Sequence, residues 1–387
     1  MNAETAPQRV LIAGITTRAL AASAVGAGYR VTAVDAFGDL DLRSVADVVM
    51  LPGEPGRRYT PATAAAAAQT LAIESVAYTS NFENYPAAVR KLAEGRRLLG
   101  NSPAVLLRVR DPLSLMRMLR NAGFSTPRTR ATRLPARQKA GSWLMKPRSS
   151  GGGHGTTVWR PGQAVPRTHY IQQRIAGVAA SVVFAADGRR AVPLGLSRQI
   201  VGDRHFGSSG FRYCGSLLGD PSALFPMAKE LFEAAGRLSD VVTREYGLIG
   251  LNGIDFITGH GVPYPIEVNP RYCASMELVE RAHGLSLFEL HVRACRGELP
   301  APVPSVPGVE GKAIVFARGN ITIGNTRGWL EHGWLADIPV HGERIRQGHP
   351  ICTVFAHGRD AGTCYKLLMK RASKVYHAVG SRKRRAA

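Results

Sequence analysis

The chain is organised around two adjacent segments, Gly250-Leu-Asn-Gly-Ile-Asp-Phe-Ile257 and Pro265-Ile-Glu-Val-Asn-Pro-Arg271. A glycine-rich turn joins these two apolar runs, which predicts a β-hairpin. Side chains alternate between the two faces of a strand, so Glu267 and Asn269, two residues apart, point the same way. Asp255 in the first strand can face this pair across the hairpin. The pattern therefore predicts three oxygen-bearing side chains on one face.

Oxygen ligands of this kind suit Mg²⁺ (or Mn²⁺) that is also held by the phosphates of a substrate. The other interpretation is a solvated polar face on a surface hairpin. Apolar residues on both sides of the segment indicate a buried hairpin, which favours the metal site. Asp255, Glu267 and Asn269 are therefore the candidate metal ligands, with Arg271 beside them.

A glycine-rich loop is predicted further upstream, in Trp143-Leu-Met-Lys-Pro-Arg-Ser-Ser-Gly-Gly-Gly-His-Gly155. A strand delivers Lys146, whose ammonium supplies a point charge for a phosphate. Three consecutive glycines then let backbone N–H groups approach an anion with no Cβ in the way. His154 contacts a phosphate or is only a loop residue, and we favour the loop residue. Because a strand ending in Lys-Pro leads directly into it, the segment indicates a phosphate-binding loop rather than a linker.

Composition excludes some classes of protein and leaves others open. The chain has 387 residues, enough for two or three domains. No apolar run reaches the ~18–20 residues needed to span a bilayer. The N-terminus shows no signal-peptide pattern, and the five cysteines are scattered without a CxxC motif. We therefore expect reduced thiols and a cytoplasmic location.

The formal net charge of +22 is unusual and is consistent with an anionic partner, such as ATP, a polycarboxylate substrate or nucleic acid. Solubility is the simpler explanation. The basic tail, Gly380-Ser-Arg-Lys-Arg-Arg-Ala-Ala387, is more often a disordered end than a nucleic-acid arm. The chain also lacks aromatic–basic interleaving and any nucleic-acid motif, which disfavours a nucleic-acid-binding protein.

Alternating strands and helices predict a doubly wound, Rossmann-like α/β domain over residues 1–110. Residues 9–15 and 29–35 are expected to be its first two strands, with a helix between them. Only Gly14 occupies the phosphate turn, so a dinucleotide site lacks its GxGxxG motif. Asp35 ends the second strand, where we favour a capping or structural role over ribose binding.

An α+β region is predicted over residues 111–300, with a small lid subdomain at about 124–175 and a large subdomain at about 176–300. A proline-rich linker then leads to a small β-rich domain with a basic tail at 308–387. The whole chain is thus α/β first and α+β afterwards. Helices are expected over Phe225–Tyr246, roughly Ala274–Leu290 and Ala361–Ala378, with Ser286-Leu-Phe-Glu as a possible restart within the second of them.

The order of these features resembles the ATP-grasp superfamily over roughly residues 9–300. An α/β domain comes first, then Lys-Pro with a glycine-rich loop, a Gln-Gln-x-Ile hinge, an Asp-bearing strand and Glu-Val-Asn-Pro-Arg. Further motifs resemble one subgroup, the predicted ATP-dependent carboligases related to biotin carboxylase. These motifs are Thr17-Arg18, Asp35-Ala-Phe-Gly-Asp39, Arg110-Asp-Pro112, Phe211-Arg-Tyr-Cys-Gly215 and Asn269-Pro-Arg-Tyr-Cys-Ala-Ser-Met276.

In this superfamily two α+β subdomains grip Mg-ATP between them, and the resemblance implies roles for residues of this chain. Lys146 and Arg271 would be catalytic, with Arg271 on the transferring phosphate or the substrate carboxylate. ATP would contact Lys146, Ser149, Ser150, Gly151, Gly152 and Gly153 in the loop and Gln172, Gln173, Arg174 and Ile175 in the hinge. There are three departures. The family's common first-position acid near the mid-domain strand is absent around Ala179–Ser181. Gln173 stands where relatives carry glutamate, and a second ATP lysine is missing, with Arg108 and Arg110 nearest to its place.

The reaction implied is ATP-dependent amide formation between a carboxylate and an amine, through an acyl phosphate. Some members of the subgroup are associated with making the C1 carriers tetrahydromethanopterin and methanofuran, so cofactor biosynthesis with a glutamate-like substrate is expected. Arg198, Arg212 and Arg271 are candidates to hold the anionic substrate, although the first two are equally well explained as surface arginines. A phosphotransferase or a carboxylase-type enzyme of the same superfamily is the alternative. The expected partners are small-molecule acids and amines, with a homodimer as one assembly.

Overall fold

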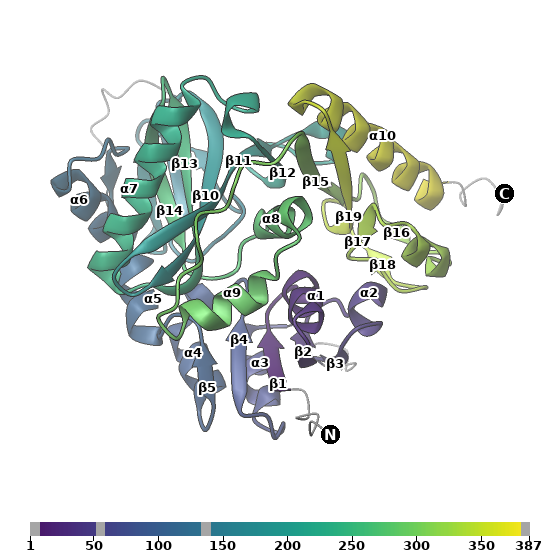
Figure 1. Cartoon of the computed structure of the whole chain (residues 1–387). Helices are drawn as coiled ribbons and strands as arrows, with labels where there is room; N and C mark the ends of the chain where they lie inside the picture. Colours follow the sequence, from purple (N-terminus) through teal and green to yellow (C-terminus); the bar gives the residue numbers. More distant parts are fainter. Residues whose placement is uncertain (1–7, 52–58, 133–140, 381–387) are drawn as a thin grey trace.

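The computed structural model describes residues 8–51, 59–132 and 141–380. Apart from Gly380, the predicted basic tail lies outside the described residues. Figure 1 shows three parts around a common centre: an N-terminal part, a large sheet with α7 (Ala228–Tyr246), and a C-terminal part with α10 (Ala361–Gly380). Within the described ranges, no helix has the length and apolar character needed to cross a membrane.

The N-terminal part is a five-stranded parallel sheet with the strand order β3-β2-β1-β4-β5. Its strands are β1 (Arg9–Ala13), β2 (Arg30–Asp35), β3 (Asp47–Met50), β4 (Ser75–Tyr78) and β5 (Arg97–Leu99). Its helices are α1 (Arg18–Gly26), α2 (Leu40–Arg43), α3 (Pro61–Ala68), α4 (Pro86–Ala93) and α5 (Pro103–Val109). The predicted parallel α/β arrangement is confirmed, and the short apolar strands are typical of a sheet buried on both faces.

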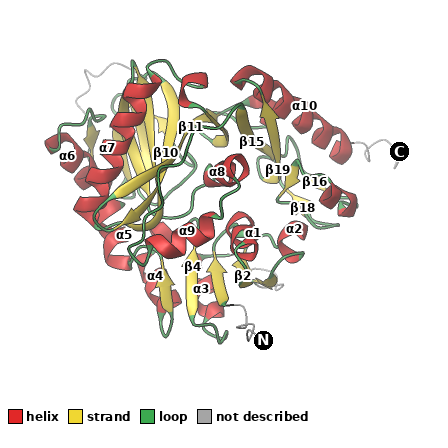
Figure 2. Cartoon of the chain, in the orientation of Figure 1, coloured by secondary structure: helices red, strands yellow, loops and turns green. Residues whose placement is uncertain are grey.

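Helices cover both faces of this sheet (Figure 2). Leu20 of α1 packs with Val10 on one face, whereas Ala64 of α3 packs with Leu11 on the other. A helix from much later in the chain, α9 (Leu287–Ala294), joins α1 on the first face through Phe288. This contact brings the segment that follows the predicted hairpin against the N-terminal sheet.

The predicted lid region contains a four-stranded antiparallel sheet in the order β6-β9-β7-β8. Its strands are β6 (Thr129–Arg130), β7 (Trp143–Pro147), β8 (Thr157–Val158) and β9 (His169–Gln173). The preceding helix, α6 (Pro112–Asn121), begins after Asp111, whose carboxylate accepts a hydrogen bond from Ser114 N at 3.1 Å. Trp143, Trp159 and Ile171 form a small core of this sheet.

The remainder is built on one eight-stranded antiparallel sheet in the order β14-β13-β10-β11-β12-β15-β19-β17. Its strands are β10 (Val178–Asp187), β11 (Ala191–Val201), β12 (Tyr213–Gly219), β13 (Ile249–Gly259), β14 (Val262–Asn269), β15 (Val309–Phe316), β17 (Leu335–Ala336) and β19 (Pro350–Gly358). α7 packs on one face through Leu238, and α8 (Met276–His283) packs on the other through Val279. A two-stranded pair, β16 (Ile321–Thr322) with β18 (Arg344–Ile345), lies apart.

Strands β15, β17 and β19 of the C-terminal part belong to the large sheet, whereas the short β16–β18 pair forms a separate two-stranded sheet. β15 pairs with β12, with Ala313 opposite Gly215, so the C-terminal strands extend the large sheet. Without β15, the edge of β12 would expose unpaired backbone N–H and C=O groups. α10 covers these strands, with Leu368 packed against Val315.

Two predicted helices have different boundaries in the structure. The helix expected from Phe225 begins at Ala228, because Met227 takes a left-handed φ of 52°. The segment 274–290 forms two helices, because Gly284 ends α8 with a left-handed φ of 64° and the chain restarts at Ser286, the N-cap of α9, where a possible restart was expected. This break turns the chain so that α9 can pack on the N-terminal sheet.

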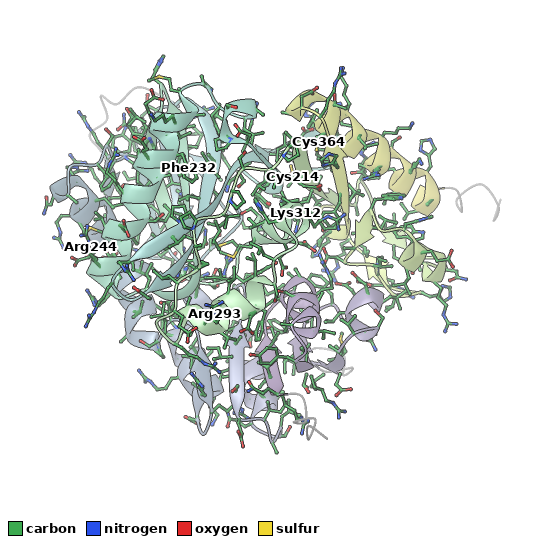
Figure 3. All side chains as sticks on the ribbon, viewed as in Figure 1. Cys214, Phe232, Arg244, Arg293, Lys312 and Cys364 are labelled. Carbon is green, nitrogen blue, oxygen red and sulfur yellow. The ribbon has the colours of Figure 1, made fainter. Side chains whose placement is uncertain are left out.

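Four charged side chains join the N-terminal part to the rest of the molecule. Three of them, Arg18, Glu277 and Lys312, are buried. Arg18 at the start of α1 donates hydrogen bonds to Asp337 at 2.9 Å and to Glu277 of α8. Lys312 of β15 donates to the other Glu277 oxygen at 2.6 Å. Burial opposes ionisation of Glu277, but Arg18 and Lys312 lower its pKa to about 2. Figure 3 shows Lys312 near the middle of the molecule, where these parts meet.

Asp39 lies near this group of charges and should make stability depend on pH. Burial, together with the charge of Asp337, raises the pKa of Asp39 to about 9, from 3.8. Between these values the folded chain keeps a proton that the unfolded chain has lost, so the free energy of unfolding falls as pH rises. An asparagine cannot lose a proton, so we expect the free energy of unfolding of Asp39→Asn not to fall in this way. The gain in this free energy over the unmodified protein should be larger near pH 8 than near pH 5, by at least about 1 kcal/mol. Urea unfolding at the two pH values measures the difference.

Asp47→Asn is the matched control. Asp47 is an exposed carboxylate at the start of β3, eight residues after Asp39, and it forms an ion pair with the exposed Arg30. Its effect should be small at both pH values. An equal gain for Asp39→Asn near pH 5 and near pH 8 would contradict the proton held by Asp39.

Candidate active site

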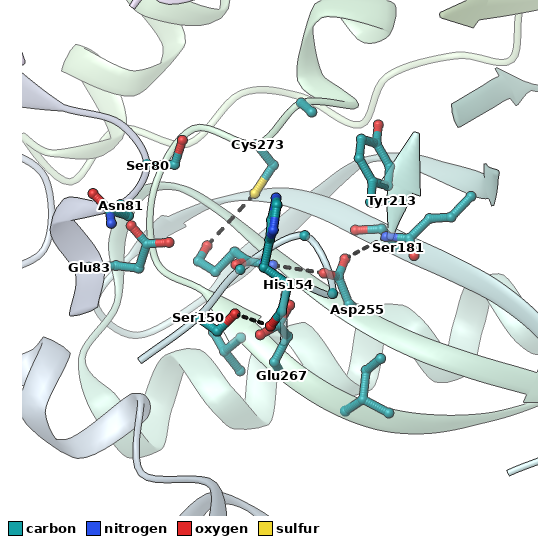
Figure 4. A pocket seen from close by; sticks show the side chains of 18 of the residues that line it. Ser80, Asn81, Glu83, Ser150, His154, Ser181, Tyr213, Asp255, Glu267 and Cys273 are labelled. Carbon is teal, nitrogen blue, oxygen red and sulfur yellow. Dashed lines mark hydrogen bonds between the residues drawn. The ribbon is translucent and has the colours of Figure 1, made fainter. Parts of the chain in front are cut away.

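One cavity of about 770 Å³ lies where the lid sheet, the large sheet and the N-terminal part meet. A cavity of this size is in the usual range for ligand-binding pockets. Figure 4 shows Asp255 and Glu267 in this cavity, with Asn81 and Glu83 to one side of them. Most of the residues predicted from the sequence line it: Lys146, Ser149, Ser150, Gly151, Gly152, Gly153, Gln172, Gln173, Arg174, Ile175, Asp255, Glu267, Asn269 and Arg271.

The predicted hairpin is present as β13 and β14, and it groups three oxygen-bearing side chains. Asp255 lies directly opposite Glu267 in the register of the two strands. The amide nitrogen of Asn269 donates to Asp255 Oδ2, and that of Gln199 donates to Asp255 Oδ1, both at 2.9 Å. The side chains that strand alternation placed on one face therefore do lie together.

The two facing carboxylates repel each other in the absence of a cation. Burial, and then the charge of Glu267, raises the pKa of Asp255 to about 7. Burial also opposes ionisation of Glu267, but Arg110 and Lys146 outweigh it and lower the pKa of Glu267. A divalent cation beside both carboxylates would relieve this repulsion, and the Asn269 amide oxygen is a further hard ligand. The donor set therefore fits Mg²⁺ or Mn²⁺.

This set is too small to enclose a metal ion without further ligands. Among the residues that the structure describes, no three His, Cys, Asp or Glu side chains are grouped so that they could hold an ion. Mg²⁺ usually keeps several positions for water and substrate phosphates. The arrangement is therefore suited to a cation that arrives with a phosphate compound.

Lys146 is held as a charged group on the neighbouring wall. Its Nζ donates to Gln172 Oε1 at 3.2 Å and lies 5.8 Å from the ring centre of Tyr170. Although burial disfavours the ammonium, Tyr170 and Glu267 raise the pKa of Lys146. The Gln172 side chain also donates to Thr129 Oγ1 at 3.3 Å. Gln172 therefore positions Lys146 in this structure, and its predicted contact with a nucleotide stays a prediction.

The glycine loop, residues 149–156, lies closed against the cavity. The Gly152 carbonyl accepts a hydrogen bond from Tyr213 N at 3.0 Å. The Ser150 hydroxyl donates to the His154 carbonyl at 2.6 Å. The side chain of His154 also lines the cavity, where burial lowers its pKa. A neutral imidazole would be a weak phosphate ligand, which is consistent with the loop role that we favoured for His154.

Gly153→Ala is expected to weaken nucleotide binding. Gly153 has a left-handed φ of 75°, and a Cβ there would lie 1.9 Å from the Phe211 carbonyl oxygen. The loop would have to move away from β12 to accept it. Strain of this kind costs ~1–3 kcal/mol, so we expect the dissociation constant of Mg-ATP to rise about tenfold or more, measured by calorimetry.

Gly151→Ala provides the control within the same loop. A Cβ at Gly151 would meet nothing within 4 Å, and the backbone there does not have a positive φ. Gly151→Ala should therefore keep the closed loop conformation and lose less affinity for Mg-ATP than Gly153→Ala. Equal affinities of the Gly151→Ala and Gly153→Ala proteins would show that the closed loop conformation does not contribute to binding.

Arg271 connects the hairpin to the N-terminal part through Glu83. Its Nη2 donates to Glu83 Oε1 at 2.7 Å and to Asn269 Oδ1 at 3.4 Å. Burial opposes the charge of Arg271, but Glu83 raises its pKa. Three buried atoms at this end of the cavity have no hydrogen-bond partner: Asn81 Oδ1, Glu83 Oε2 and Arg271 Nε. A ligand in the cavity can satisfy them.

Asn81 and Glu83 were not assigned a role from the sequence. They follow β4, at the carboxyl end of a parallel strand, which is where open α/β sheets bind ligands. Their position after a predicted parallel strand could therefore have identified them as candidate ligand-binding residues. The ion pair with Arg271, 188 residues away in the chain, could be seen only in the folded protein.

The two arginines nearest to the expected position of the second ATP lysine differ in exposure. Arg110 lines the cavity and its side chain is 11% exposed. The side chain of Arg108 is 57% exposed, donates to the Glu245 carbonyl at 2.7 Å and lies over the Tyr246 ring. Of these two arginines, Arg110 is therefore the one that lies at the site.

Two arginines predicted to hold a substrate do not lie in this cavity. Arg198 is exposed and points away from it, because it alternates along β11 with the cavity-lining Gln199. Arg212 donates to the Gly348 carbonyl at 2.6 Å and lies 5.0 Å from the ring centre of Phe316. Its guanidinium thus ties β12 to the C-terminal part. We do not carry either arginine into the proposed site.

Asp35 has the structural role that we favoured for it. Its Oδ2 accepts hydrogen bonds from both the backbone N and the hydroxyl of Thr17 at 2.7 Å. Its Oδ1 accepts from Phe37 N and Gly38 N at 2.7 and 2.8 Å. The carboxylate is therefore occupied in holding the turns after β1 and β2.

Comparison with known proteins agrees with this geometry. Residues 109–275 match the family model of the ATP-grasp domain. The chain therefore contains an ATP-grasp domain. Its matched segment contains the glycine loop, the hinge and the β13–β14 hairpin, so the resemblance predicted from the sequence is confirmed.

A curated relative of the chain is the formate-dependent phosphoribosylglycinamide formyltransferase of Syntrophotalea carbinolica. The two are 28% identical over 179 residues, which cover 46% of this chain and 45% of the relative. The match thus spans less than half the length of the formyltransferase, and the activity of that enzyme is not carried over by it.

Solved structures resemble the ATP-grasp chain over nearly its whole length. The biotin carboxylase domain of 2-oxoglutarate carboxylase from Hydrogenobacter thermophilus, with MgADP and bicarbonate, has a TM-score of 0.70 at 14% identity and covers 97% of this chain and 91% of its own. The L-amino acid ligase of Bacillus licheniformis has a TM-score of 0.70 at 13% identity, with coverages of 95% and 97%. At these identities the likeness shows the fold alone, and it confirms the predicted ATP-grasp fold.

Proposed function

We propose that the chain is an ATP-dependent carboxylate–amine ligase that forms an amide through an acyl phosphate. One observation carries this proposal: Lys146, the facing carboxylates Asp255 and Glu267, and Arg271 share one cavity beneath the glycine loop. A carboxylate is a poor electrophile, and accepting the γ-phosphoryl group of ATP converts it into an acyl phosphate that an amine can attack. This chemistry needs positioning and charge neutralisation rather than a nucleophilic side chain.

The phosphoryl-transfer end of the cavity is the hairpin and the opposite lysine. A carboxylate oxygen of the acid attacks the γ-phosphorus, the bond to the bridging oxygen breaks, and ADP leaves. Mg²⁺ held by Asp255, Glu267 and Asn269 would supply charge neutralisation at the ATP phosphates. Lys146 and Arg271 hold fixed positive charges toward the oxygens on which charge develops. The MgADP complex of the biotin carboxylase domain supports a nucleotide and a metal of this kind.

The amine end of the cavity is at Asn81 and Glu83. Their unpartnered oxygens are acceptors, so a ligand that satisfies them brings N–H groups. An amine has this character. Its nitrogen attacks the acyl carbon, inorganic phosphate leaves, and Glu83 takes the proton that the nitrogen releases. Because Glu83 is ion-paired with Arg271, the amine and the activated carboxyl group are held side by side.

An anionic acid is the best-supported class of carboxylate substrate. The net charge of +22 attracts polyanions, and Arg271 lies inside the cavity. With the subgroup resemblance, this leads us to propose a glutamate-like substrate and a role in cofactor biosynthesis. A glutamate-bearing precursor of a C1 carrier, of the tetrahydromethanopterin or methanofuran type, is the first natural candidate to test.

A carboxylase-type reaction is the second candidate. The likeness to a biotin carboxylase domain solved with bicarbonate favours it. In that reaction bicarbonate would take the place of the organic acid, and carboxyphosphate would take the place of the acyl phosphate. Arg271 and Lys146 would hold the smaller anion in the same end of the cavity.

Hydroxylamine can replace the unknown amine in a direct test, because it converts an acyl phosphate into a hydroxamate. The protein is incubated with Mg-ATP, hydroxylamine and one acid at a time: glutamate, glutamyl peptides, formate or bicarbonate. The ligase proposal expects ADP, inorganic phosphate and a hydroxamate in equal amounts with at least one organic acid. Mass spectrometry identifies the hydroxamate.

Other outcomes separate the alternatives. ADP release that depends only on bicarbonate would favour the carboxylase. ADP formation with a stable phosphorylated product and no hydroxamate would identify a phosphotransferase. Absence of Mg-ATP binding would reject all three reactions.

A further inference from the structure

Arg110 uses every hydrogen-bond donor of its guanidinium within the protein. Nε and Nη2 donate to Asn84 Oδ1 at 3.2 and 2.8 Å. Nη1 donates to Glu267 Oε2 at 3.3 Å and to the Val268 carbonyl at 2.9 Å. Nη2 also donates to the Ser150 carbonyl at 2.9 Å. An arginine has five N–H donors, so all of them have a partner in this structure.

These partners belong to three separate segments of the chain. Asn84 lies in the turn after β4, Glu267 and Val268 lie in the metal-ligand strand β14, and Ser150 opens the glycine loop. Arg110 itself caps the C-terminal end of α5. Its guanidinium is therefore the point at which the N-terminal part, the hairpin and the loop are joined by one rigid, planar group.

The bond to Ser150 differs from the other four. It is made to a backbone carbonyl of the loop that lies against the cavity, and it is the bond that breaks when the loop moves away. A separate hydrogen bond, donated by Tyr213 N to the Gly152 carbonyl, holds the opposite side of the loop. Opening the loop thus frees one charged N–H at Arg110, beside Glu267.

We propose that Arg110 is a positioning residue, a latch that holds loop 149–156 closed and couples the position of this loop to Glu267. The proposal rests on the proposed function, because it assumes that the loop covers a bound nucleotide. With the loop open, the freed N–H is available to an incoming phosphate. With the loop closed, it returns to Ser150 and slows release of the ligand.

Hydrogen–deuterium exchange of residues 149–156 tests the latch without any ligand. The amides of His154 and Thr156 donate to Gly151 and Gly153 within the loop and report its loosening, and the amide of Tyr213 donates across to the Gly152 carbonyl and reports its opening. Lysine cannot span three segments, so Arg110→Lys should speed exchange of these amides about tenfold, the usual effect of losing a charged hydrogen bond. It should also speed dissociation of a fluorescent ATP analogue, measured by stopped flow, with little change in the association rate.

Arg108→Lys is the matched control, because Arg108 lies on the same helix, is exposed and contacts Glu245 and Tyr246 instead of the loop. It should leave loop exchange unchanged. Asn84→Ala removes the acceptor of two bonds without touching the loop or β14, and it should speed loop exchange by a smaller factor. This variant decides the question if Arg110→Lys does not fold.

The outcomes distinguish failure of the latch from failure of the proposed function. Unchanged loop exchange in both Arg110→Lys and Asn84→Ala overturns the latch, whether or not the protein binds ATP. Faster loop exchange with unchanged dissociation of the ATP analogue overturns the coupling to the ligand. Faster exchange in a protein that binds no ATP supports the contact to Ser150 and rejects the proposed function instead.

Discussion

Glu267→Gln is expected to lower the rate of ATP-dependent hydroxamate formation by about 100-fold or more, because it removes one of the two carboxylates at the proposed metal site. Loss of a metal ligand costs several kcal/mol of transition-state stabilisation, and ~2.7 kcal/mol corresponds to 100-fold in rate. Glutamine keeps the shape of the side chain but leaves the charges of Arg110 and Lys146 without their nearby partner. The value of kcat/KM for hydroxamate formation is the measurement.

The dependence on Mg²⁺ separates loss of a ligand from a general defect. If Glu267 binds the metal, raising the Mg²⁺ concentration should restore part of the activity of Glu267→Gln. Glu94→Gln is the control, because Glu94 is an exposed carboxylate on the surface, paired with Lys91. Undiminished turnover in Glu267→Gln would reject the metal assignment, while an equal loss in Glu94→Gln would show that the assay does not report on the site.

Glu277→Gln is expected to lower the free energy of unfolding by about 3–5 kcal/mol. The substitution leaves Arg18 and Lys312 buried at the junction of the three parts, and Lys312 loses the carboxylate to which it donates. Desolvation of the two cations is no longer offset by the charge that lies between them. The midpoint of urea unfolding and the thermal unfolding temperature measure this loss.

An exposed ion pair of similar chemistry provides the control. Arg293 and Glu298 lie 3.1 Å apart, with side chains 46% and 58% exposed, so Glu298→Gln should cost less than about 1 kcal/mol. The double variant Glu277→Gln with Lys312→Met should recover part of the loss, because it removes one unpaired cation. Equal effects of Glu277→Gln and Glu298→Gln would show that the buried group does not hold the parts together.

The candidate metal site could be predicted because it depends on local chain geometry. Asp255, Glu267 and Asn269 lie in two strands joined by a short turn, and alternation along a strand determines which side chains share a face. The glycine loop was also recognisable, since three glycines after Lys146 are unusual in a strand-to-loop junction. Both features are properties of a short segment, so one sequence was sufficient.

Other parts of the site depend on contacts that no local pattern encodes. Glu83 reaches Arg271 across 188 residues, and Arg110 reaches Glu267 across 157. The side chain of Arg198 lies outside the cavity for a related reason. Its charge suggested a substrate contact, but the register of β11 points Gln199, not Arg198, toward Asp255.

The hairpin Gly250–Arg271 by itself predicted the candidate metal ligands, because strand alternation acts over a few residues. The order of Lys146, the glycine loop, the hinge and the hairpin along the sequence then indicated the ATP-grasp fold and the type of chemistry. The tertiary structure alone decided what surrounds those ligands. Packing of α9 on the N-terminal sheet and pairing of β15 with β12 bring Glu83, Arg110 and Lys312 to one cavity. Burial there makes charges interact strongly, and this is what raises the pKa of Asp255 and joins Arg110 to both the loop and Glu267.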